Sequence, residues 1–335
     1  MRVVVLGGTG YVGSWLVPHL LGDGHFVRVF DIMWFGDGFL PKDNAHLELI
    51  RGDIRDVPAL RKAFDGMDAV VNLACVSNDT SCQLDEALSA SINYAAFEPM
   101  VVAAKESGIK RFIYCSSSSV YGVSDLPDVF EDTPCIPMTL YNASKAECER
   151  RLWPHHSKDF VCVVIRPATV CGYAPRMRFD LTVNIMTNHA VQKGLITVFG
   201  GMQKRPNLHI KDMADVYKLL LRAPDEKIAG QTFNVGAQNM RVSEIAELIS
   251  KVVGDEFKRA VPIQTEASQD NRSYHVNSSK IAEVLGFRPR FTVEDAIRDI
   301  CVQFKKGNFK DSLTAPVYTN IVQMQQQGFG AKETA

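Results

Sequence analysis

The chain has 335 residues, of which 46% are hydrophobic and 22% charged, and its formal net charge is −1 at pH 7. This length allows one large or two medium-sized domains, and the near-neutral charge gives no electrostatic reason to expect nucleic acid as a partner. No apolar run approaches the roughly 20 residues of a membrane-spanning helix, so we expect no membrane partner either.

The cysteines indicate a reducing environment. All eight are scattered along the chain and none forms a Cys-x-x-Cys pair, which argues against a metal site. Cys115 and Cys162 fall in apolar runs and are typical of small buried side chains. The chain also enters a predicted strand directly at Arg2, without a signal-peptide pattern. We therefore expect a cytoplasmic protein.

The N-terminal stretch predicts a dinucleotide site. An apolar strand over Arg2–Leu6 leads into a glycine-rich turn and a helix over about Tyr11–Leu21. Glycines let the backbone approach a pyrophosphate closely, and the helix N-terminus offers unpaired N–H groups. Two spacings fit, G-x-G-x-x-G from Gly8 and G-x-x-G-x-x-G from Gly7. The candidate cofactor-binding residues of this turn are Gly7, Gly10, Tyr11, Val12 and Gly13.

The next two predicted strands, His25–Phe30 and Leu47–Arg51, both end beside acidic residues. Asp31 lies about 20 positions after the glycines, where an acid binds ribose hydroxyls and repels a 2′-phosphate, so we expect NAD rather than NADP. Asp53 could accept a hydrogen bond from the adenine amino group, or it could cap the predicted helix at 56–64. The cofactor candidates from these strands are Asp31, Asp53 and Ile54.

The fourth and fifth predicted strands, Ala69–Leu73 and Arg111–Cys115, enclose a long helical pattern from about Asp85 to Ser107. Small residues after the fourth strand would allow close passage of the cofactor. Asn93 is a polar residue on a mostly apolar helix, so it is either a buried structural hydrogen-bonding residue or part of a proton relay. The candidates here are Leu73, Ala74, Asn93 and Cys115.

A tyrosine and a lysine predict the chemistry. Tyr141 and Lys145 lie four positions apart, hence on one face of a helix that runs to about Trp153. A free phenol, with a pKa of about 10, is a poor base at neutral pH, but a neighbouring ammonium group favours the phenolate. Such a base could take the proton of an alcohol while a hydride leaves the same carbon. A surface tyrosine beside a lysine is the alternative interpretation.

Phe160–Arg166 completes a series of six strands that alternate with helices, which predicts an α/β fold with a doubly wound parallel sheet of the Rossmann type. Beyond residue 170 the elements are shorter, among them a helix with Asn184 and a strand at Ile196–Phe199. A helix at Lys211–Arg222 and a strand at Thr232–Val235 are expected to return to the main sheet. Further helices are predicted near 242–253, 278–285 and 293–306.

These elements predict two domains and a tail. The NAD-binding Rossmann domain would comprise residues 1–170 plus about 211–235, and a smaller α/β substrate-binding lobe would comprise about 171–210 plus 236–306. The stretch at 307–335 is rich in glutamine and weakly periodic. We expect it to be disordered or to wrap a neighbouring molecule.

The ordered motifs resemble those of a known family. They are GGTGYVG at 7–13, Asp31, GDI at 52–54, NLAC at 72–75, SSSSVYG at 116–122, YNASK at 141–145 and RPATVCG at 166–172. Over roughly residues 1–305 the chain resembles the extended short-chain dehydrogenases/reductases, specifically the NAD-dependent nucleotide-sugar epimerases and dehydratases.

The resemblance implies roles for individual residues. Ser117 would orient the sugar 4-hydroxyl, Tyr141 would take its proton, and Lys145 would lower the tyrosine pKa and bind ribose. The partner would be a nucleoside-diphosphate sugar, which loses a hydride from C4 to the nicotinamide. Arginines suit its diphosphate, although each could instead form a surface ion pair. The substrate-binding candidates are Ser117, Thr169, Arg176, Asn184, Arg205 and Arg272. The family also implies a homodimer that pairs through the helices at 85–107 and 140–153.

Two departures from the family pattern narrow the reaction. The 4,6-dehydratases carry an Asp-Glu pair where this chain has Ser118 and Ser119, and 3,5-epimerases carry a cysteine at the second position. The resemblance therefore favours a 4-epimerase that acts through a 4-keto intermediate. A hexose or heptose 4-dehydrogenase is the alternative. The segment 174–181 resembles a segment of heptose 4-dehydrogenases in which the arginines line the sugar pocket. A 4,6-dehydratase and a non-catalytic NAD-binding protein are less favoured.

Overall fold

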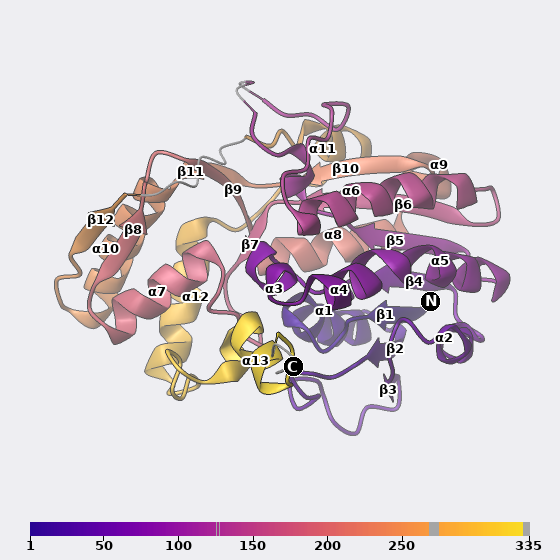
Figure 1. Ribbon diagram of the computed structural model, residues 1–335, viewed down its shortest axis with the longest axis horizontal. Coiled ribbons are helices and arrows are strands. Elements are labelled where there is room, and N and C mark those ends of the chain that lie inside the picture. The colour runs from indigo at the N-terminus through magenta and orange to yellow at the C-terminus, as the bar shows by residue number, and fades with distance from the viewer. Residues whose placement is uncertain (125, 127, 268–274, 331–335) are drawn as a thin grey trace, which may run out of the picture.

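The computed structural model describes every residue except 125, 127, 268–274 and 331–335 (Figure 1). Within the described residues, a seven-stranded parallel sheet forms the larger part of the molecule. Its order is β10 (Gln231–Val235), β6 (Val161–Pro167), β5 (Arg111–Cys115), β4 (Ala69–Asn72), β1 (Arg2–Leu6), β2 (Phe26–Asp31) and β3 (Leu47–Arg51). The predicted doubly wound sheet is confirmed.

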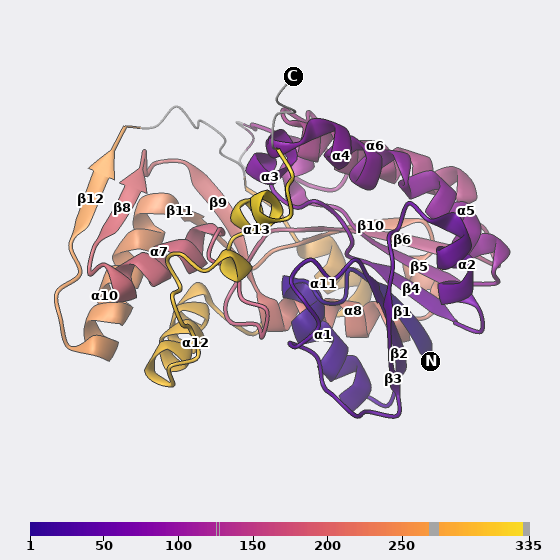
Figure 2. The ribbon, with the colours of Figure 1, turned by 60° about the horizontal axis from the view of Figure 1, so that its bottom comes forward.

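Both faces of this sheet are buried, which explains its continuous apolar strands. Successive residues of β1 alternate between two cores: Val3 and Val5 belong to one, Val4 and Leu6 to the other. The first core lies under α1 (Tyr11–Gly22), α8 (Ile210–Arg222) and α11 (Ser279–Leu285). The second lies under α2 (Val57–Phe64), α5 (Phe97–Glu106) and α6 (Leu140–Leu152). Figure 2 shows these two sets of helices on opposite sides of the sheet.

The strand order reverses between β1 and β4, where the chain winds outward in both directions. In open α/β sheets a crevice forms outside the carboxyl ends of the strands at this point, and ligands bind there. The glycine turn follows β1 and the segment Leu73–Cys75 follows β4, so both reach this crevice.

The second lobe consists of short sheets and a helical core (Figure 1). Strand β9 (Lys204–His209) pairs with β7 (Thr169–Cys171) and β11 (Gln238–Arg241), and β8 (Ile196–Phe199) pairs with β12 (Ile263–Glu266). The core lies among α7 (Thr182–Gln192), α10 (Val242–Phe257) and α12 (Val293–Lys305). Strands β11 and β12 escape sequence prediction because they are short and polar, and every residue of β12 is exposed.

Three local features differ from the expectations. The helical pattern at 85–107 is divided into α4 (Glu86–Ala90), whose N-terminus the Asp85 side chain caps, a π-helical turn (Ser91–Ala95) and α5. Ahead of it, α3 (Asp79–Leu84) is an additional helix. Helix α11 lies against β10 of the main sheet, and its Ile281 packs in the core of that sheet rather than in the second lobe. The short α9 (Asp225–Ile228) joins α8 to β10.

The described part of the tail folds back on its own chain, contrary to the expectation of disorder or of a wrapped neighbour. Helix α13 (Asn320–Gln326) lies between the second lobe and the main sheet (Figures 1 and 2). Met324 packs in the core of the sheet, and the Gln323 Nε2 donates a hydrogen bond to the Trp34 carbonyl at 2.7 Å. The rings of Trp34 and Phe329 have centroids 4.9 Å apart. These anchors are too widely spaced to produce a recognisable pattern.

A buried ion pair joins α6 to β6. Arg166 and Glu149 have side chains only 8% and 5% exposed, and Arg166 Nη2 lies 2.6 Å from Glu149 Oε2. Arg166 also donates to the Tyr121 hydroxyl at 2.7 Å, and Ser116 Oγ donates to Glu149 Oε1. The Glu149 carboxylate and the Tyr121 hydroxyl raise the pKa of Arg166 and outweigh the opposing effect of burial. This network fixes the helix that carries Tyr141 and Lys145 to the strand beside it.

The described residues contain neither a candidate membrane span nor a cluster of metal-binding side chains. None of the helices in that part of the chain has the length and apolar character needed to cross a membrane. Nor do three histidine, cysteine or acidic side chains come together there in an arrangement that could hold a metal ion.

Candidate active site

A cavity of about 440 Å³ lies at the carboxyl ends of the central strands and extends to the second lobe. Its size is within the range of small-molecule sites. The structure brings most of the predicted site residues together on its walls. Those lining the cavity are Gly7, Gly10, Tyr11, Val12, Gly13, Asp31, Asp53, Ile54, Leu73, Ala74, Cys115, Ser117, Tyr141, Lys145, Thr169, Arg176 and Arg205.

Two predicted residues lie outside the cavity wall. Asn93 is buried, and its amide both accepts from the Val76 N–H and donates to the Val76 carbonyl at 2.8 Å, which is the structural alternative considered for it. Asn184 is fully buried, accepts from Gly172 N–H and donates to Tyr11 and to the Arg178 carbonyl. Because these bonds use its amide group, Asn184 holds the cavity wall together rather than facing a phosphate. Arg272 lies outside the described residues.

The glycine turn is shaped for close backbone approach. Gly7 has φ +77°, and a Cβ there would lie 2.8 Å from the Ala74 backbone. Gly7, Gly10 and Gly13 line the cavity whereas Gly8 does not, which favours the G-x-x-G-x-x-G spacing. Gly10 caps α1 without a side-chain hydrogen bond, so N–H groups of the first turn remain available to an anion.

Substituting one of these glycines tests the turn. A Cβ at Gly13 would lie 2.4 Å from the Gly8 carbonyl oxygen, so Gly13→Ala requires a backbone shift. We expect the free energy of unfolding to fall by about 1–3 kcal/mol. We also expect that calorimetry no longer detects NAD binding. Gly22→Ala is the matched control on the same helix, because a Cβ at Gly22 meets nothing within 4 Å. Equal behaviour of the two variants would contradict this account.

Acidic residues after β2 and β3 line the far end of the cavity. The Asp31 carboxylate accepts hydrogen bonds from Thr9 N–H at 2.9 Å and Met33 N–H at 2.7 Å, which fix its orientation. Asp53 is paired with Arg55, whose hydrogen bonds lower the pKa of that carboxyl against the opposing effect of burial. Asp53 is not the cap of α2; Asp56 is, with its side chain accepting from Ala59 N–H. Together the glycine turn and Asp31 form a site that fits the pyrophosphate and ribose of a dinucleotide.

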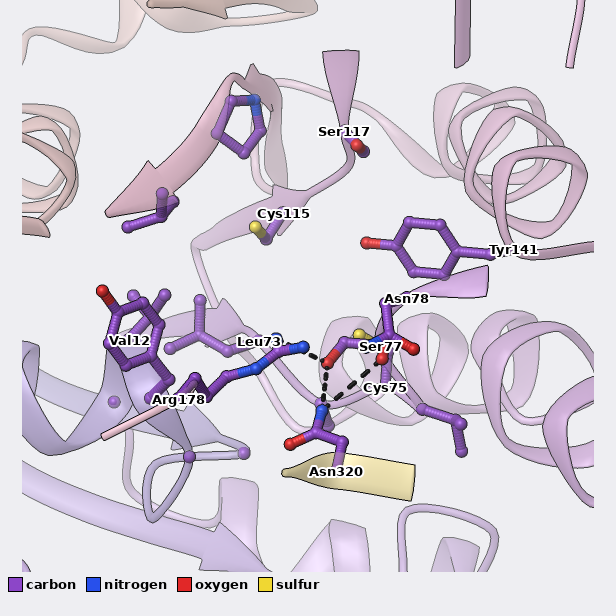
Figure 3. A pocket seen from close by; sticks show the side chains of 18 of the residues that line it. Val12, Leu73, Cys75, Ser77, Asn78, Cys115, Ser117, Tyr141, Arg178 and Asn320 are labelled. Atoms are coloured by element: carbon purple, nitrogen blue, oxygen red, sulfur yellow. Dashed lines mark hydrogen bonds between the residues drawn. The ribbon is translucent and has the colours of Figure 1, made fainter. Parts of the chain in front are cut away.

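The catalytic candidates surround one side of the cavity (Figure 3). Tyr141 points its hydroxyl into the cavity, with Ser117 on a neighbouring wall and the Cys115 side chain across from the hydroxyl. Lys145 Nζ donates to the Cys115 carbonyl at 2.7 Å and lies 5.8 Å from the Tyr141 ring centroid. Ser117 Oγ lies 2.7 Å from Ser119 Oγ. A proton acceptor, a cation and a hydroxyl therefore share one surface.

The electrostatics of this pair differ from the expectation. Burial raises the pKa of Tyr141 above its ordinary value, and Lys145 lowers it, as predicted, but by less. Burial also acts to lower the pKa of Lys145, yet the ionisable Cys75 and Tyr141 beside it keep the net pKa above its ordinary value. Lys145 thus stays charged, and its effect on Tyr141 is real but does not by itself yield a phenolate at neutral pH.

Several cavity residues escaped sequence reasoning. Ser77, Asn78 and Asp79 line the cavity after β4, and a polar run directly after a buried strand is the pattern that indicates them. Asn78 has φ +81°, an uncommon value for a residue other than glycine. Asn320 of α13 also lines the cavity, and its Nδ2 donates to Ser77 Oγ at 2.8 Å (Figure 3). Nothing in the weakly periodic tail indicates that contact.

Known proteins of similar sequence and structure share this architecture. The UDP-glucose 4-epimerase of Lactobacillus helveticus is 26% identical over 319 residues, covering 89% of this chain and 95% of that protein. The dTDP-glucose 4,6-dehydratase of Streptomyces griseus is 26% identical over 309 residues, covering 88% and 92%. The structure of UDP-glucuronic acid 4-epimerase from Bacillus cereus, in complex with UDP-glucuronic acid and NAD, has a TM-score of 0.81 at 24% identity, covering 91% and 99%.

The family is shown by a match over most of the chain. The model of the NAD dependent epimerase/dehydratase family matches residues 3–236, which include the glycine turn, Asp31, Ser117, Tyr141 and Lys145. The predicted family, enzyme class and cofactor are confirmed, and the glycine turn and Asp31 fit that cofactor. This chain belongs to the NAD dependent epimerase/dehydratase family, whose members are NAD-dependent enzymes acting on nucleotide sugars.

Proposed function

We propose that this protein is a nucleoside-diphosphate-sugar 4-epimerase that oxidises C4 of the sugar and reduces the 4-keto intermediate on its other face. One observation carries the proposal: Ser117, Tyr141 and Lys145 share a cavity with the glycine turn, while serines occupy the two positions after Ser117. The first group suffices to oxidise and reduce an alcohol, and the serines supply no acid for eliminating water.

In this proposal each residue acts on a defined atom. Tyr141 accepts the proton of the sugar 4-hydroxyl and returns it when the ketone is reduced. Ser117 donates to or accepts from the same oxygen and fixes its direction. Lys145 stabilises the tyrosinate. Bound NAD would supply the hydride acceptor.

The residues after Ser117 favour epimerase over 4,6-dehydratase, although both occur among the relatives. Ser118 is 1% exposed, and Ser119 Oγ donates to Asn142 Oδ1 at 2.7 Å. A serine hydroxyl stays protonated at neutral pH, so neither residue provides the acid and base that expel a 6-hydroxyl. A 4,6-dehydratase would need those groups from elsewhere in the cavity.

The nucleotide part of the substrate would bind toward the second lobe. Thr169 of β7 and Arg205 of β9 line the cavity from that side, and we assign the diphosphate of the nucleotide sugar to Arg205. The substrate would thus bridge the main sheet and the second lobe.

We also propose a cytoplasmic homodimer without nucleic acid as partner. The eight cysteines are all free, as expected in a reducing compartment. On α5, Pro99 is exposed and Val102 half-buried, and we assign the contact with a second copy to this face. Sedimentation of the full chain tests the dimer, and a monomer at all concentrations would remove it.

An absorbance assay separates the epimerase from a 4-dehydrogenase. The purified enzyme is incubated with UDP- and dTDP-linked hexoses and with excess NAD, and reduced nicotinamide is monitored at 340 nm while the sugar products are analysed. For a 4-epimerase we expect the C4 epimer to form without net reduction. Stoichiometric accumulation of reduced nicotinamide with a keto-sugar would instead establish a 4-dehydrogenase, and no change in any sugar would remove both.

A further inference from the structure

Two arginines between β7 and α7 reach into the cavity with unused hydrogen-bond donors. Arg176 is 1% exposed and Arg178 is 8% exposed, and both line the cavity. Within the described structure, Arg176 Nε and Arg178 Nη2 have no hydrogen-bond partner. Buried guanidinium groups normally have all their N–H donors satisfied. The unused donors therefore indicate a ligand that presents acceptor oxygens.

Arg176 also lacks a directly paired carboxylate among the described residues, and the acidic groups that act on its charge, Asp180 and Asp31, do so without an ion pair. Arg178 pairs with Asp180, with Arg178 Nε 2.8 Å from Asp180 Oδ1, but Arg176 forms no ion pair with any residue that the structure describes. Its guanidinium carbon lies 3.5 Å from the Phe35 ring centroid. Burial, together with the positive charge of Arg178, lowers the pKa of Arg176 to about 9. A buried cation without an anion destabilises a protein, and an anionic ligand would offset that cost.

The position of Arg176 identifies which anion. Its backbone N–H donates to Ser14 Oγ at 3.1 Å, and Ser14 N–H donates to the Gly10 carbonyl at the start of α1. Phe35, which lies against its guanidinium, follows the strand that ends in Asp31. Arg176 is thus tied to the end of the cavity where the glycine turn and Asp31 fit a dinucleotide, whereas Arg205 enters from β9.

Arg178 reaches the same region from the other direction. Its Nη1 donates to Ser77 Oγ at 3.0 Å, just beyond the end of β4, and Figure 3 shows its side chain crossing the cavity toward Ser77. A diphosphate seated on the N-terminus of α1 lies in the crevice between β1 and β4. The two guanidinium groups therefore face that position from the second-lobe side.

We propose that Arg176 and Arg178 bind the diphosphate of the NAD cofactor, opposite the glycine turn, so that the second lobe encloses the cofactor. Arg176 is thereby assigned to the cofactor instead of the nucleotide sugar expected from the sequence. The assignment rests on the NAD dependence of the family and not on the choice between epimerase and dehydrogenase.

Asn320 is a positioning residue for this pair. Its Oδ1 accepts from Arg176 Nη2 at 2.6 Å, its Nδ2 donates to Ser77 Oγ, and its backbone N–H donates to Asp180 Oδ2 at 3.0 Å. The first residue of α13 therefore contacts Arg176 and both partners of Arg178. Asn320→Ala should lower the affinity for the same ligands as Arg176→Gln, but to a smaller extent. If the role of Asn320 is purely structural, the substitution should lower the stability of the protein without affecting some ligands more than others.

The test compares ligands that differ in their phosphates. Calorimetric titrations of full-length Arg176→Gln, freed of copurified nucleotide, use NAD, ADP-ribose, adenosine and UDP. Loss of charged hydrogen bonds to a diphosphate should weaken NAD and ADP-ribose about 10–100-fold. Adenosine lacks the diphosphate and UDP binds elsewhere, so the affinities of both should be unchanged. Arg205→Gln is the matched control and should leave ADP-ribose binding unchanged.

Stability measurements exclude a folding defect. Because Arg176 is a buried cation without a directly paired anion, ligand-free Arg176→Gln should melt at the same or a higher temperature than the wild type, while the stabilisation by NAD should shrink. Unchanged affinity for ADP-ribose would overturn the proposal, and so would a loss confined to UDP, which would return Arg176 to the substrate. If the protein shows this binding pattern but no epimerase activity, the role proposed for Arg176 is supported and only the proposed function is refuted.

Discussion

Replacing Tyr141 with phenylalanine is expected to lower turnover by about 10²–10⁴-fold, the usual contribution of a general base, and to leave NAD affinity nearly unchanged. The substitution removes one oxygen from a side chain that points into the cavity and keeps the ring that packs there. Steady-state rates with the active nucleotide sugar and calorimetric titration with NAD provide the two measurements.

The pH dependence gives a second readout for the same residue. The base must be deprotonated, and burial raises the pKa of Tyr141 more than Lys145 lowers it. The phenolate fraction therefore grows about tenfold per pH unit below that pKa, and kcat/KM of the wild type should rise from about pH 6 to 9. In Tyr141→Phe this rise should disappear.

A second tyrosine provides the control. Tyr94 contacts Arg151 on the surface side of its helix and does not line the cavity, so Tyr94→Phe should turn over normally. If Tyr141→Phe keeps turnover within tenfold of the wild type, or keeps the rise with pH, then Tyr141 is not the base.

Glu149→Gln is expected to destabilise the fold by about 3–5 kcal/mol, because it leaves the Arg166 cation buried without its anion. The two side chains meet at 2.6 Å and are almost fully enclosed between α6 and β6. Chemical denaturation with urea measures the change, which should appear as a lower midpoint with an unchanged slope.

The matched control lies two residues earlier on the same helix. Glu147 pairs with Arg150 and Arg151, but its side chain is 32% exposed, so Glu147→Gln should cost at most about 1 kcal/mol. Similar losses in both variants would contradict the role given to the buried pair. Replacing both Arg166 and Glu149 with apolar residues should recover part of the stability lost by Glu149→Gln.

The sequence was sufficient wherever one local pattern determined the structure. Strands such as β1 are buried on both faces and are therefore continuous apolar runs in the sequence, and Gly7 and Gly13 of the turn mark positions where a Cβ would clash with backbone. The spacing of Tyr141 and Lys145 determines that they share a helix face. These features predict most of the candidate residues that line the cavity from the sequence alone.

Other features depend on contacts that no local pattern records. Asn320 touches Ser77 across 243 positions of sequence, and β12 is a polar edge strand with every residue exposed. Asn184 matches a phosphate-binding position of the family, yet its side-chain amide is hydrogen-bonded to the backbone of Gly172 and Arg178. The pKa of Tyr141 is raised because the effect of burial exceeds that of Lys145. The sequence identifies Lys145 as a neighbour but does not reveal how deeply Tyr141 is buried.

The position of α13 has a consequence for synthesis of the protein. The last strand of the main sheet ends at Val235, so the sheet can form while the chain is still growing, whereas Asn320 leaves the ribosome only after the second lobe has followed. A nascent or prematurely ended chain would thus have its sheet and glycine turn but not the residue that links Arg176 to Ser77. Firm retention of the dinucleotide would then distinguish chains that include α13 from chains that lack it.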